Sequence, residues 1–257
     1  MRFSHAIVRA PCPSFADGLT TAGLGKPDVA KALAQHEAYV RALRLCGLDV
    51  TALPPDDDHP DSTFVEDTAV ISASFAVATR PGAPSREGEV APIRALLADR
   101  FDRIGTIEAP GTLDGGDICD AGERFFLGVS HRTNEAGAAQ LKAFLEAHGR
   151  PSTNIDIRGV PGILHLKSGV SAIAPDTLVV IDDLAGHPAF SGHRMIRVPP
   201  EEAYAANCVR VNDHVLFAAG YPRLEASLRE AGFSLLTLDM SEFRKMDGGL
   251  SCLSLRY

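Results

Sequence analysis

The feature that most limits the fold of this 257-residue chain is a repeated order of segments. Residues 29–46 have the apolar spacing of a helix, with Pro27-Asp28 before it and Gly47 after it as start and stop signals. Three strand-like runs follow, at residues 49–53, 64–72 and 75–79. Similar units begin near residues 90, 135, 185 and 222, the segment at 185–193 being less regular. A period of roughly 45–50 residues is typical of a repeat architecture.

The two ends of the chain complete this pattern. The fifth unit has strand-like runs only at residues 234–238 and 250–255, whereas the run at residues 3–9 belongs to no unit and can supply the missing strand. Joining both ends in one sheet hides sheet edges and secures the C-terminal tail. We therefore expect an α/β fold with residues 1–257 in a single domain, arranged as a pseudo-symmetric five-bladed propeller closed by the N- and C-terminal strands.

A doubly wound sheet is the main alternative fold. Neither G-x-G-x-x-G nor G-x-x-x-x-G-K-[ST] follows a strand-like run, so the usual phosphate-binding motifs of that fold are missing. The sequence therefore favours the propeller.

Charge and hydropathy exclude several classes of function. The formal net charge of -8 and the pI of about 5.6 argue against nucleic-acid binding and favour a small cationic ligand. No stretch approaches the roughly 18 apolar residues that a membrane span needs. The first residues have no long apolar core before Arg9, so we expect no signal peptide and a cytoplasmic location.

The five cysteines are odd in number, widely spaced and without a C-x-x-C pair, which argues against a zinc knuckle and for free thiols. The most informative of them is Cys252, five residues from the end of the chain. It follows an Asp247-Gly248-Gly249 turn and lies in an apolar run predicted to be a strand. From the residues alone, it is either a packed core thiol or a nucleophile that needs a base.

A polar side chain falls near the start of the second strand of every unit. These side chains are Glu66 with Asp67, Asp117, His165, Asn207 and Cys252, in runs predicted at residues 64–72, 117–120, 165–173, 207–211 and 250–255. If the units surround one axis, these groups meet at its centre, where charges are costly unless a ligand or partner neutralises them. A thiol beside an imidazole can then supply a thiolate nucleophile and a proton donor.

Further polar residues could complete such a site, although each also has a purely structural explanation as a turn acid or a solvated loop residue. Asp114 could orient His165, and Asp61 could join the two adjacent acids in clamping a planar cation. The loop residues Arg86 and Arg132 could fix a carboxylate, and residues 17–26, with three glycines, could form a mobile lid.

Taken in order, these segments resemble the dimethylarginine dimethylaminohydrolase family of the guanidino-group-modifying (pentein) superfamily. The matching segments are His5-Ala6-Ile7-Val8-Arg9-Ala10, Pro60-Asp61 with Phe64-Val65-Glu66-Asp67, Ala205-Ala206-Asn207-Cys208, and residues 79–86, 113–117, 130–134, 164–168 and 247–252. The resemblance implies a five-bladed α/β propeller. It also implies hydrolysis of Nω,Nω-dimethyl-L-arginine or Nω-monomethyl-L-arginine to L-citrulline and dimethylamine or methylamine, through a covalent cysteine S-alkylthiouronium.

The resemblance also implies a role for individual residues. Cys252 resembles the nucleophile, His165 the general acid and base, and Asp114 the acid that orients the histidine. The implied substrate contacts are Asp67 with Glu66 for the guanidinium, Asp61 and the Leu19 main chain for the α-amino group, Arg86 and Arg132 for the α-carboxylate, and the backbone of Met246. Neither a metal nor an organic cofactor is implied. Mammalian relatives have a second cysteine directly after the nucleophile, where this chain has Leu253.

Three alternatives remain open at this stage. An arginine deiminase or another guanidino-group-modifying enzyme would use the same thiol, imidazole and carboxylates. A non-catalytic guanidine-binding protein could keep the fold, and a protein binding zinc through Cys252 and His165 would hold stoichiometric metal. In each enzymatic case the expected partner is a small cationic amino acid, and the chain could be a monomer or a homodimer.

Overall fold

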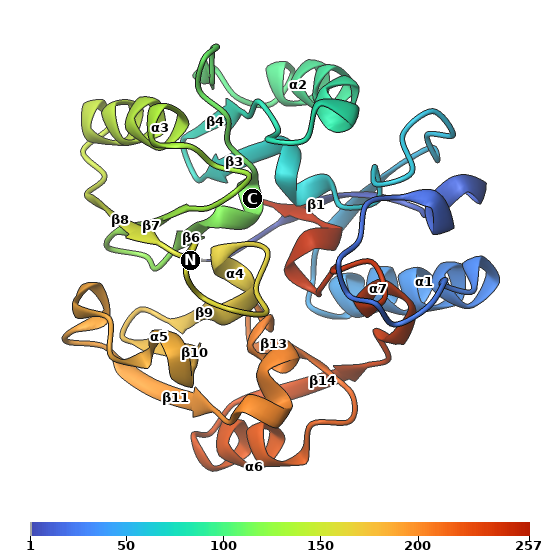
Figure 1. The fold of residues 1–257 in the computed structure, drawn as a ribbon, viewed down its shortest axis with the longest axis vertical. Helices are drawn as coiled ribbons and strands as arrows, with labels where there is room; N and C mark the ends of the chain where they lie inside the picture. The colour runs from blue at the N-terminus through green and yellow to red at the C-terminus, as the bar shows by residue number, and fades with distance from the viewer. Residues whose placement is uncertain (1) are drawn as a thin grey trace.

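The computed structural model describes residues 2–257, which form five small sheets arranged in a ring (Figure 1). The strands are β1 (His5–Arg9), β2 (Asp49–Leu53), β3 (Ala69–Ser72), β4 (Phe75–Ala78), β5 (Ile104–Thr106), β6 (Ile118–Asp120), β7 (Phe125–Val129), β8 (Ser152–Asp156), β9 (Val170–Ala174), β10 (Thr177–Ile181), β11 (Arg194–Val198), β12 (Val209–Val211), β13 (His214–Ala218), β14 (Ser234–Leu238) and β15 (Leu255–Arg256). The sheet orders are β15-β1-β2, β3-β4-β5, β6-β7-β8, β11-β10-β9 and β12-β13-β14. The predicted five-bladed α/β propeller is therefore confirmed.

All five sheets share one pairing pattern. The middle strand pairs antiparallel with one neighbour and parallel with the other, as β4 does with β3 and β5. The middle strands β4, β7 and β10 are buried at every residue, which explains their continuous apolar sequences. The five blades therefore have the same internal order.

The helices lie mainly on the outside of the ring (Figure 1). They are α1 (Val29–Leu45), α2 (Val90–Ala98), α3 (Glu135–Ala147), α4 (Leu166–Gly169), α5 (Asp182–Ala185), α6 (Pro222–Glu230) and α7 (Ser241–Arg244). Asp28 caps α1 by accepting a hydrogen bond from the Lys31 amide, and Tyr39 and Leu43 bury its inner face. The fourth blade has no long helix: the irregular segment predicted at 185–193 contains the end of α5 and a 3-10 turn at Pro188–Phe190.

The chain ends meet in one sheet, as the sequence predicted. β15 pairs antiparallel with β1, placing Ile7 opposite Leu255, and β1 pairs parallel with β2 along its full length. The amides of Ser4 and His5 both donate to the Tyr257 carbonyl. These bonds tie down the segment that carries Cys252.

The predicted starts of three second strands are wrong by five residues, at β3, β9 and β15, whereas those of β6 and β12 are within one or two. The polar residues of these runs lie in or beside short helical segments: η2 (Val65–Thr68), η4 (Gly115–Asp117), α4, η6 (Pro200–Ala206) and η7 (Ser251–Leu253). Cys252 is therefore in a helical turn, and His165 is the residue before α4. Apolar spacing alone could not separate a buried helical turn from a strand end, because both bury consecutive side chains.

Each short segment bonds to the next around the propeller axis. The bonds run from the Gly116 amide to Asp67 (2.9 Å), the Leu166 amide to Asp117 (2.9 Å), the Asn207 amide group to the Lys167 carbonyl (2.9 Å), the Ser251 amide to Asn207 (2.9 Å) and the Ser251 hydroxyl to Glu66 (2.6 Å). These five bonds are called the axial ring below. In four of them a polar side chain bonds to a backbone amide or carbonyl of the neighbouring segment, which explains why these residues lie outside the strands.

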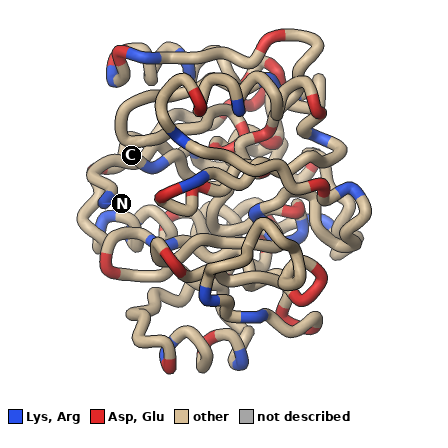
Figure 2. The backbone as a smooth tube through the Cα atoms, turned by 90° about the vertical axis from the view of Figure 1, so that its left-hand side faces the viewer, with Lys and Arg blue, Asp and Glu red and all other residues tan. Residues whose placement is uncertain are grey.

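The outer surface carries both signs of charge. In the side view of Figure 2, acidic and basic residues alternate over the visible face. Among the described residues, no helix combines the length and the apolar character needed to cross a membrane.

Candidate active site

A small pocket of about 20 Å³ lies where the loop before α1, η2, the segment before α4 and the segment before η7 meet. Its walls are formed by Leu19, Asp61, Phe64, Asp67, Arg86, Arg132, Leu164, His165, Met246, Asp247, Gly248 and Cys252. Of the residues singled out in the sequence, the pocket brings together Cys252, His165 and the implied substrate contacts other than Glu66, whereas Asp114, Asp117, Asn207 and Glu66 do not line it. Asp114 lies behind His165, and Glu66 faces a different cavity.

Two glycines place Cys252 on its turn. A Cβ at Gly248 would lie 2.2 Å from the Phe64 ring, and one at Gly249 would lie 2.5 Å from the side chain of Asn207, so neither position has room for a larger residue. The Gly249 amide donates to the Cys252 Sγ at 3.4 Å. The chain before Cys252 is therefore fixed by close contacts on both sides.

The Cys252 thiol is neutral at physiological pH. Burial is the main reason that its pKa is raised to about 12, and the negative charges of Glu66 and Asp67 act in the same direction. A thiolate at this position needs an additional positive charge beside it.

His165 is held as a cation by the surrounding acids. Burial alone would lower its pKa, but the charges of Asp67 and Asp117 and the hydrogen bond that the ring donates to Asp114 outweigh it and raise the pKa to about 9. The ring Nε2 lies 3.0 Å from the Asp114 Oδ2. At neutral pH the site therefore pairs a neutral thiol with an imidazolium.

Asp114 connects this histidine to a neighbouring loop. Its carboxylate is completely buried and accepts a hydrogen bond from the Gly82 amide at 2.8 Å, while Arg132 lies 4.0 Å from its other oxygen. The short aspartate side chain reaches His165 directly, so no longer acid is needed at this position.

Asp67 and Arg86 form a buried ion pair along the pocket wall. The Arg86 Nη1 lies 2.6 Å from the Asp67 Oδ2, and the same guanidinium contacts Glu89 at 2.7 Å. Burial would raise the pKa of Asp67, yet the charges of His165 and Arg86 hold it at about 2. Asp67 is thus an ionised carboxylate beside the thiol, and Arg86 donates to two acids and to two backbone carbonyls.

Asp61 and Leu19 lie together at the far end of the pocket. Both Asp61 oxygens accept from the Leu19 amide at 3.1 Å. Burial raises the pKa of Asp61 although Arg86 opposes it. Residues 17–26 are joined to the segment before η7, because the Thr21 amide and hydroxyl donate to the carboxylate of Asp247. That this segment is a mobile lid stays a prediction.

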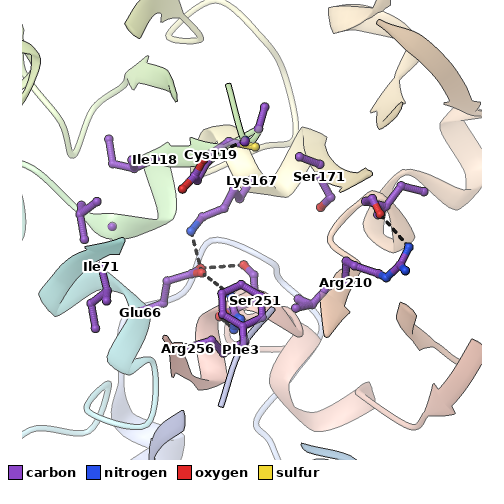
Figure 3. Close-up of a pocket in the computed structure, with 18 of the residues that line it drawn as sticks. Phe3, Glu66, Ile71, Ile118, Cys119, Lys167, Ser171, Arg210, Ser251 and Arg256 are labelled. Carbon is purple, nitrogen blue, oxygen red and sulfur yellow. Dashed lines mark hydrogen bonds and ion pairs between the residues drawn. The ribbon is translucent and has the colours of Figure 1, made fainter. Parts of the chain in front are cut away.

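Glu66 lies on the other side of the axial ring, in a central cavity of about 380 Å³ (Figure 3). Its carboxylate contacts Lys167 at 2.6 Å and Arg256 at 3.3 Å and accepts a hydrogen bond from Ser251 at 2.6 Å. The guanidinium that Glu66 contacts is therefore that of Arg256, and its contact with the guanidinium of a substrate stays a prediction.

Asp67, Asp114 and His165 place their carboxylate oxygens and ring nitrogen within 4.8 Å of one another. His165 is bonded to Asp114, and Asp67 is bonded to Arg86, as described above; Cys252 is not a member of this cluster. The cluster is well suited to hold a proton on the histidine.

Sequence reasoning missed several residues that support the site. Glu89 follows Arg86 by three positions, a spacing that places two side chains on one helical face and could have revealed the ion pair. Arg256 is a charge within an apolar tail, which is a signal for a buried partner, and that partner is Glu66. The contact of Asp247 with the lid had no sequence signal.

Comparison with known proteins agrees with this geometry, although no family model matches the chain. The N(G),N(G)-dimethylarginine dimethylaminohydrolase of Pseudomonas aeruginosa is 46% identical over 257 residues, covering 99% of this chain and 100% of the relative. The protein of the same name from Streptomyces coelicolor is 37% identical over 257 residues, covering 100% of this chain and 98% of the relative.

Solved structures extend the likeness to three dimensions. A mutant of the Pseudomonas aeruginosa enzyme complexed with citrulline superimposes with a TM-score of 0.96 at 44% identity, covering 100% of both chains. The N-terminal domain of the arginine dihydrolase ArgZ has a TM-score of 0.87 at 18% identity, covering 100% of this chain and 97% of that domain, which shows a shared fold alone. By its identity to enzymes of this kind over the whole described chain, the protein belongs to the dimethylarginine dimethylaminohydrolase family.

Proposed function

We propose that this protein hydrolyses Nω,Nω-dimethyl-L-arginine and Nω-monomethyl-L-arginine to L-citrulline and the corresponding methylamine, with Cys252 as the nucleophile. The observation that carries the proposal is the shared pocket of Cys252, His165 and Asp67. It combines a thiol, a protonated imidazole and an ionised carboxylate, which are the three groups that displacement of an amine from a guanidinium requires.

The charges of the pocket make the nucleophile depend on the substrate. The cationic guanidinium pairs with Asp67 and lowers the pKa of the Cys252 thiol, which releases its proton when substrate binds. Free enzyme then keeps an unreactive thiol, and thiolate forms only beside its target carbon.

The reaction proceeds in two displacements. The Cys252 thiolate forms a bond to the guanidinium carbon, His165 gives its proton to the departing dimethylamine, and the C–N bond breaks to leave an S-alkylthiouronium. Neutral His165 then takes a proton from water as that water adds to the same carbon. The C–S bond breaks as the added hydroxyl becomes the carbonyl of citrulline, and the hydroxyl proton passes to the departing sulfur, which restores the Cys252 thiol. Asp114 keeps the imidazole in place throughout.

The amino-acid part of the substrate lies toward the lid. We assign the α-amino group to Asp61 and the Leu19 main chain and the α-carboxylate to Arg132 with Arg86. Arg132 is the freer of the two, since its side chain approaches an acid only at 4.0 Å. The pocket of about 20 Å³ holds about one water, so substrate entry requires the lid to leave Asp247.

A paired assay tests the proposed function. Purified protein is given asymmetric dimethylarginine or arginine at equal concentration, citrulline is measured, and reactions are quenched in acid for mass spectrometry of the intact protein. We expect faster turnover of dimethylarginine and a covalent adduct on Cys252. Faster turnover of arginine would identify a deiminase instead, and neither citrulline nor adduct would identify a binding protein.

Two properties outside the site complete the proposal. We propose that the single catalytic unit of residues 1–257 works in the cytoplasm as a monomer or a homodimer. Light scattering during size-exclusion chromatography separates these two states, which correspond to about 27.3 kDa or twice that mass.

A further inference from the structure

Asp117 is a buried carboxylate to which the proposed mechanism assigns no step. It is completely inaccessible to solvent and ends η4, three residues after Asp114. Three hydrogen bonds converge on it: the Leu166 amide donates to Oδ1 at 2.9 Å, and the hydroxyls of Ser130 and Thr133 donate to Oδ2 at 2.7 and 2.6 Å. A buried anion with this many donors is a strongly fixed point in the fold.

One of these bonds reaches the catalytic histidine. Leu166 directly follows His165, so the bond from its amide fixes the backbone from which the imidazole projects. Strand β7 has a glycine, Gly128, where it passes the bond between the Leu166 amide and Asp117. A Cβ at Gly128 in β7 would lie 2.8 Å from the Asp117 Oδ1 and 2.9 Å from the Leu166 Cβ, so a larger residue there would displace both.

The other two bonds reach the substrate-binding loop. The Ser130 hydroxyl, while donating to Asp117, accepts from the Arg132 amide at 2.9 Å. The Thr133 hydroxyl likewise accepts from the Asp114 amide at 3.1 Å. Through one intermediate hydroxyl each, the carboxylate therefore holds the backbones of Arg132 and Asp114.

We propose that Asp117 is a positioning residue for the hydrolysis, the common anchor that sets His165, Asp114 and Arg132 relative to one another. This inference rests on the proposed function. It differs from the role of Asp114, which contacts the imidazole itself. Asp117 acts only through a backbone amide and two hydroxyls.

The charge of Asp117 has a second effect on the same histidine. The charged and titratable groups around His165 are Asp67 from η2, Asp114 and Asp117 around η4, Asp61 and Arg86 in the same pocket, Arg132 from the loop after β7, and Asp247 and Cys252 from the C-terminal segment. Burial raises the pKa of Asp117 to about 6 against the opposing effect of His165, so the carboxylate is ionised at neutral pH and favours the imidazolium.

The test compares Asp117→Asn with two hydroxyl variants. Asparagine keeps the size and an acceptor oxygen but removes the charge. We expect kcat for dimethylarginine to fall by about 10- to 100-fold, because even a small displacement of the His165 imidazole misaligns it with the departing amine. The fall of kcat/KM at high pH, called its alkaline limb, reports the loss of the His165 proton. In Asp117→Asn this limb should move to lower pH by about one unit, because His165 loses a nearby negative charge.

The matched controls separate the links. Ser130→Ala leaves the charge in place and loosens the Arg132 loop, so KM should rise several-fold while the alkaline limb stays fixed. Thr133→Val loosens only the Asp114 link, so kcat should fall with the alkaline limb again fixed. Wild-type enzyme in the same assay must turn over dimethylarginine; if it does not, the proposed function fails rather than this inference.

Folded Asp117→Asn with kcat within about twofold of wild type and an unmoved alkaline limb would overturn the inference. If Asp117→Asn does not fold, circular dichroism will show it, and Ser130→Ala and Thr133→Val then decide. Unchanged KM and kcat in both of those folded variants would equally refute the anchor.

Discussion

The two hollows beside the propeller axis differ in size and in chemistry. The central cavity has about 380 Å³, whereas the pocket that contains Cys252 and His165 has about 20 Å³. In the cavity, Glu66 bonds to Lys167, Arg256 and Ser251, so its charge is already balanced (Figure 3). In the pocket, burial and the charges of Glu66 and Asp67 raise the pKa of the Cys252 thiol to about 12, so the thiol is held neutral. Incomplete charge balance, rather than volume, identifies the reactive side.

The same three segments build both hollows. Glu66 and Asp67 are adjacent in η2, and Ser251 and Cys252 are adjacent in η7; the first of each pair faces the cavity and the second the pocket. Near α4, His165 lines the pocket and Lys167 the cavity. Neighbouring residues thus face opposite sides of the axial ring. We therefore expect substitutions on the pocket side to reduce activity and those on the cavity side to affect mainly stability.

The largest difference is expected at Ser251 and Cys252. Cys252→Ser removes the nucleophile and should reduce kcat by at least about 10³-fold without loss of folding. Ser251→Ala removes only the hydroxyl bonded to Glu66, so kcat should stay within about tenfold of wild type. Steady-state citrulline assays measure both, and substantial turnover by Cys252→Ser would remove the nucleophile assignment.

The two acids of η2 should separate activity from stability. Asp67→Asn removes the charge that faces the thiol and the imidazolium, so kcat/KM should fall by about 10²-fold. Glu66→Gln leaves Lys167 and Arg256 as buried cations without a carboxylate, which should cost about 3 kcal/mol and lower Tm by about 10 °C. Thermal melts and steady-state kinetics are measured for both variants. A larger loss of kcat/KM in Glu66→Gln than in Asp67→Asn would contradict the prediction.

The pocket should also set the alkaline limit of activity. Because the reaction needs His165 as an acid and its pKa is about 9, kcat/KM should fall about tenfold per pH unit above that value. The same shift affects folding: its contribution to stability is complete below about 6.5, the unfolded value, and is lost as pH rises through about 9. Rates and melts between pH 6 and 10 test both, and a limb near 6.5 would contradict the charge network.

The smallest effects are expected when a small residue is enlarged, either Gly116 beside the pocket or Ala172 in the central cavity. A Cβ at Gly116 would lie 2.7 Å from the His165 Nδ1 and 2.8 Å from the Asp67 Oδ1, so Gly116→Ala should reduce kcat/KM by about tenfold. Ala172 lines the roomy cavity, and Ala172→Leu should leave kcat/KM within about twofold. A stronger loss from Ala172→Leu than from Gly116→Ala would show that the cavity also shapes the catalytic side.

The sequence predicted the repeated units, the closure by both chain ends and most of the pocket, because periodicity and matched segments carry that information. It misplaced the strand starts at His165 and Cys252, since a buried helical turn has the same apolar residues as a strand end. It also could not place Glu66 and Asp67 on opposite sides, because the direction of adjacent side chains depends on a turn that only the folded chain defines.

Because of the axial ring, the active site cannot be assembled from any one part of the chain alone. Its five bonds join residues from every blade, and Ser251 bonds to Glu66 across 185 positions of the chain. No single blade, folded by itself, would hold Cys252, His165 and Asp67 in one place. Catalytic activity should therefore disappear in the same cooperative transition as the sheets themselves, which makes turnover a direct report on whether the propeller is closed.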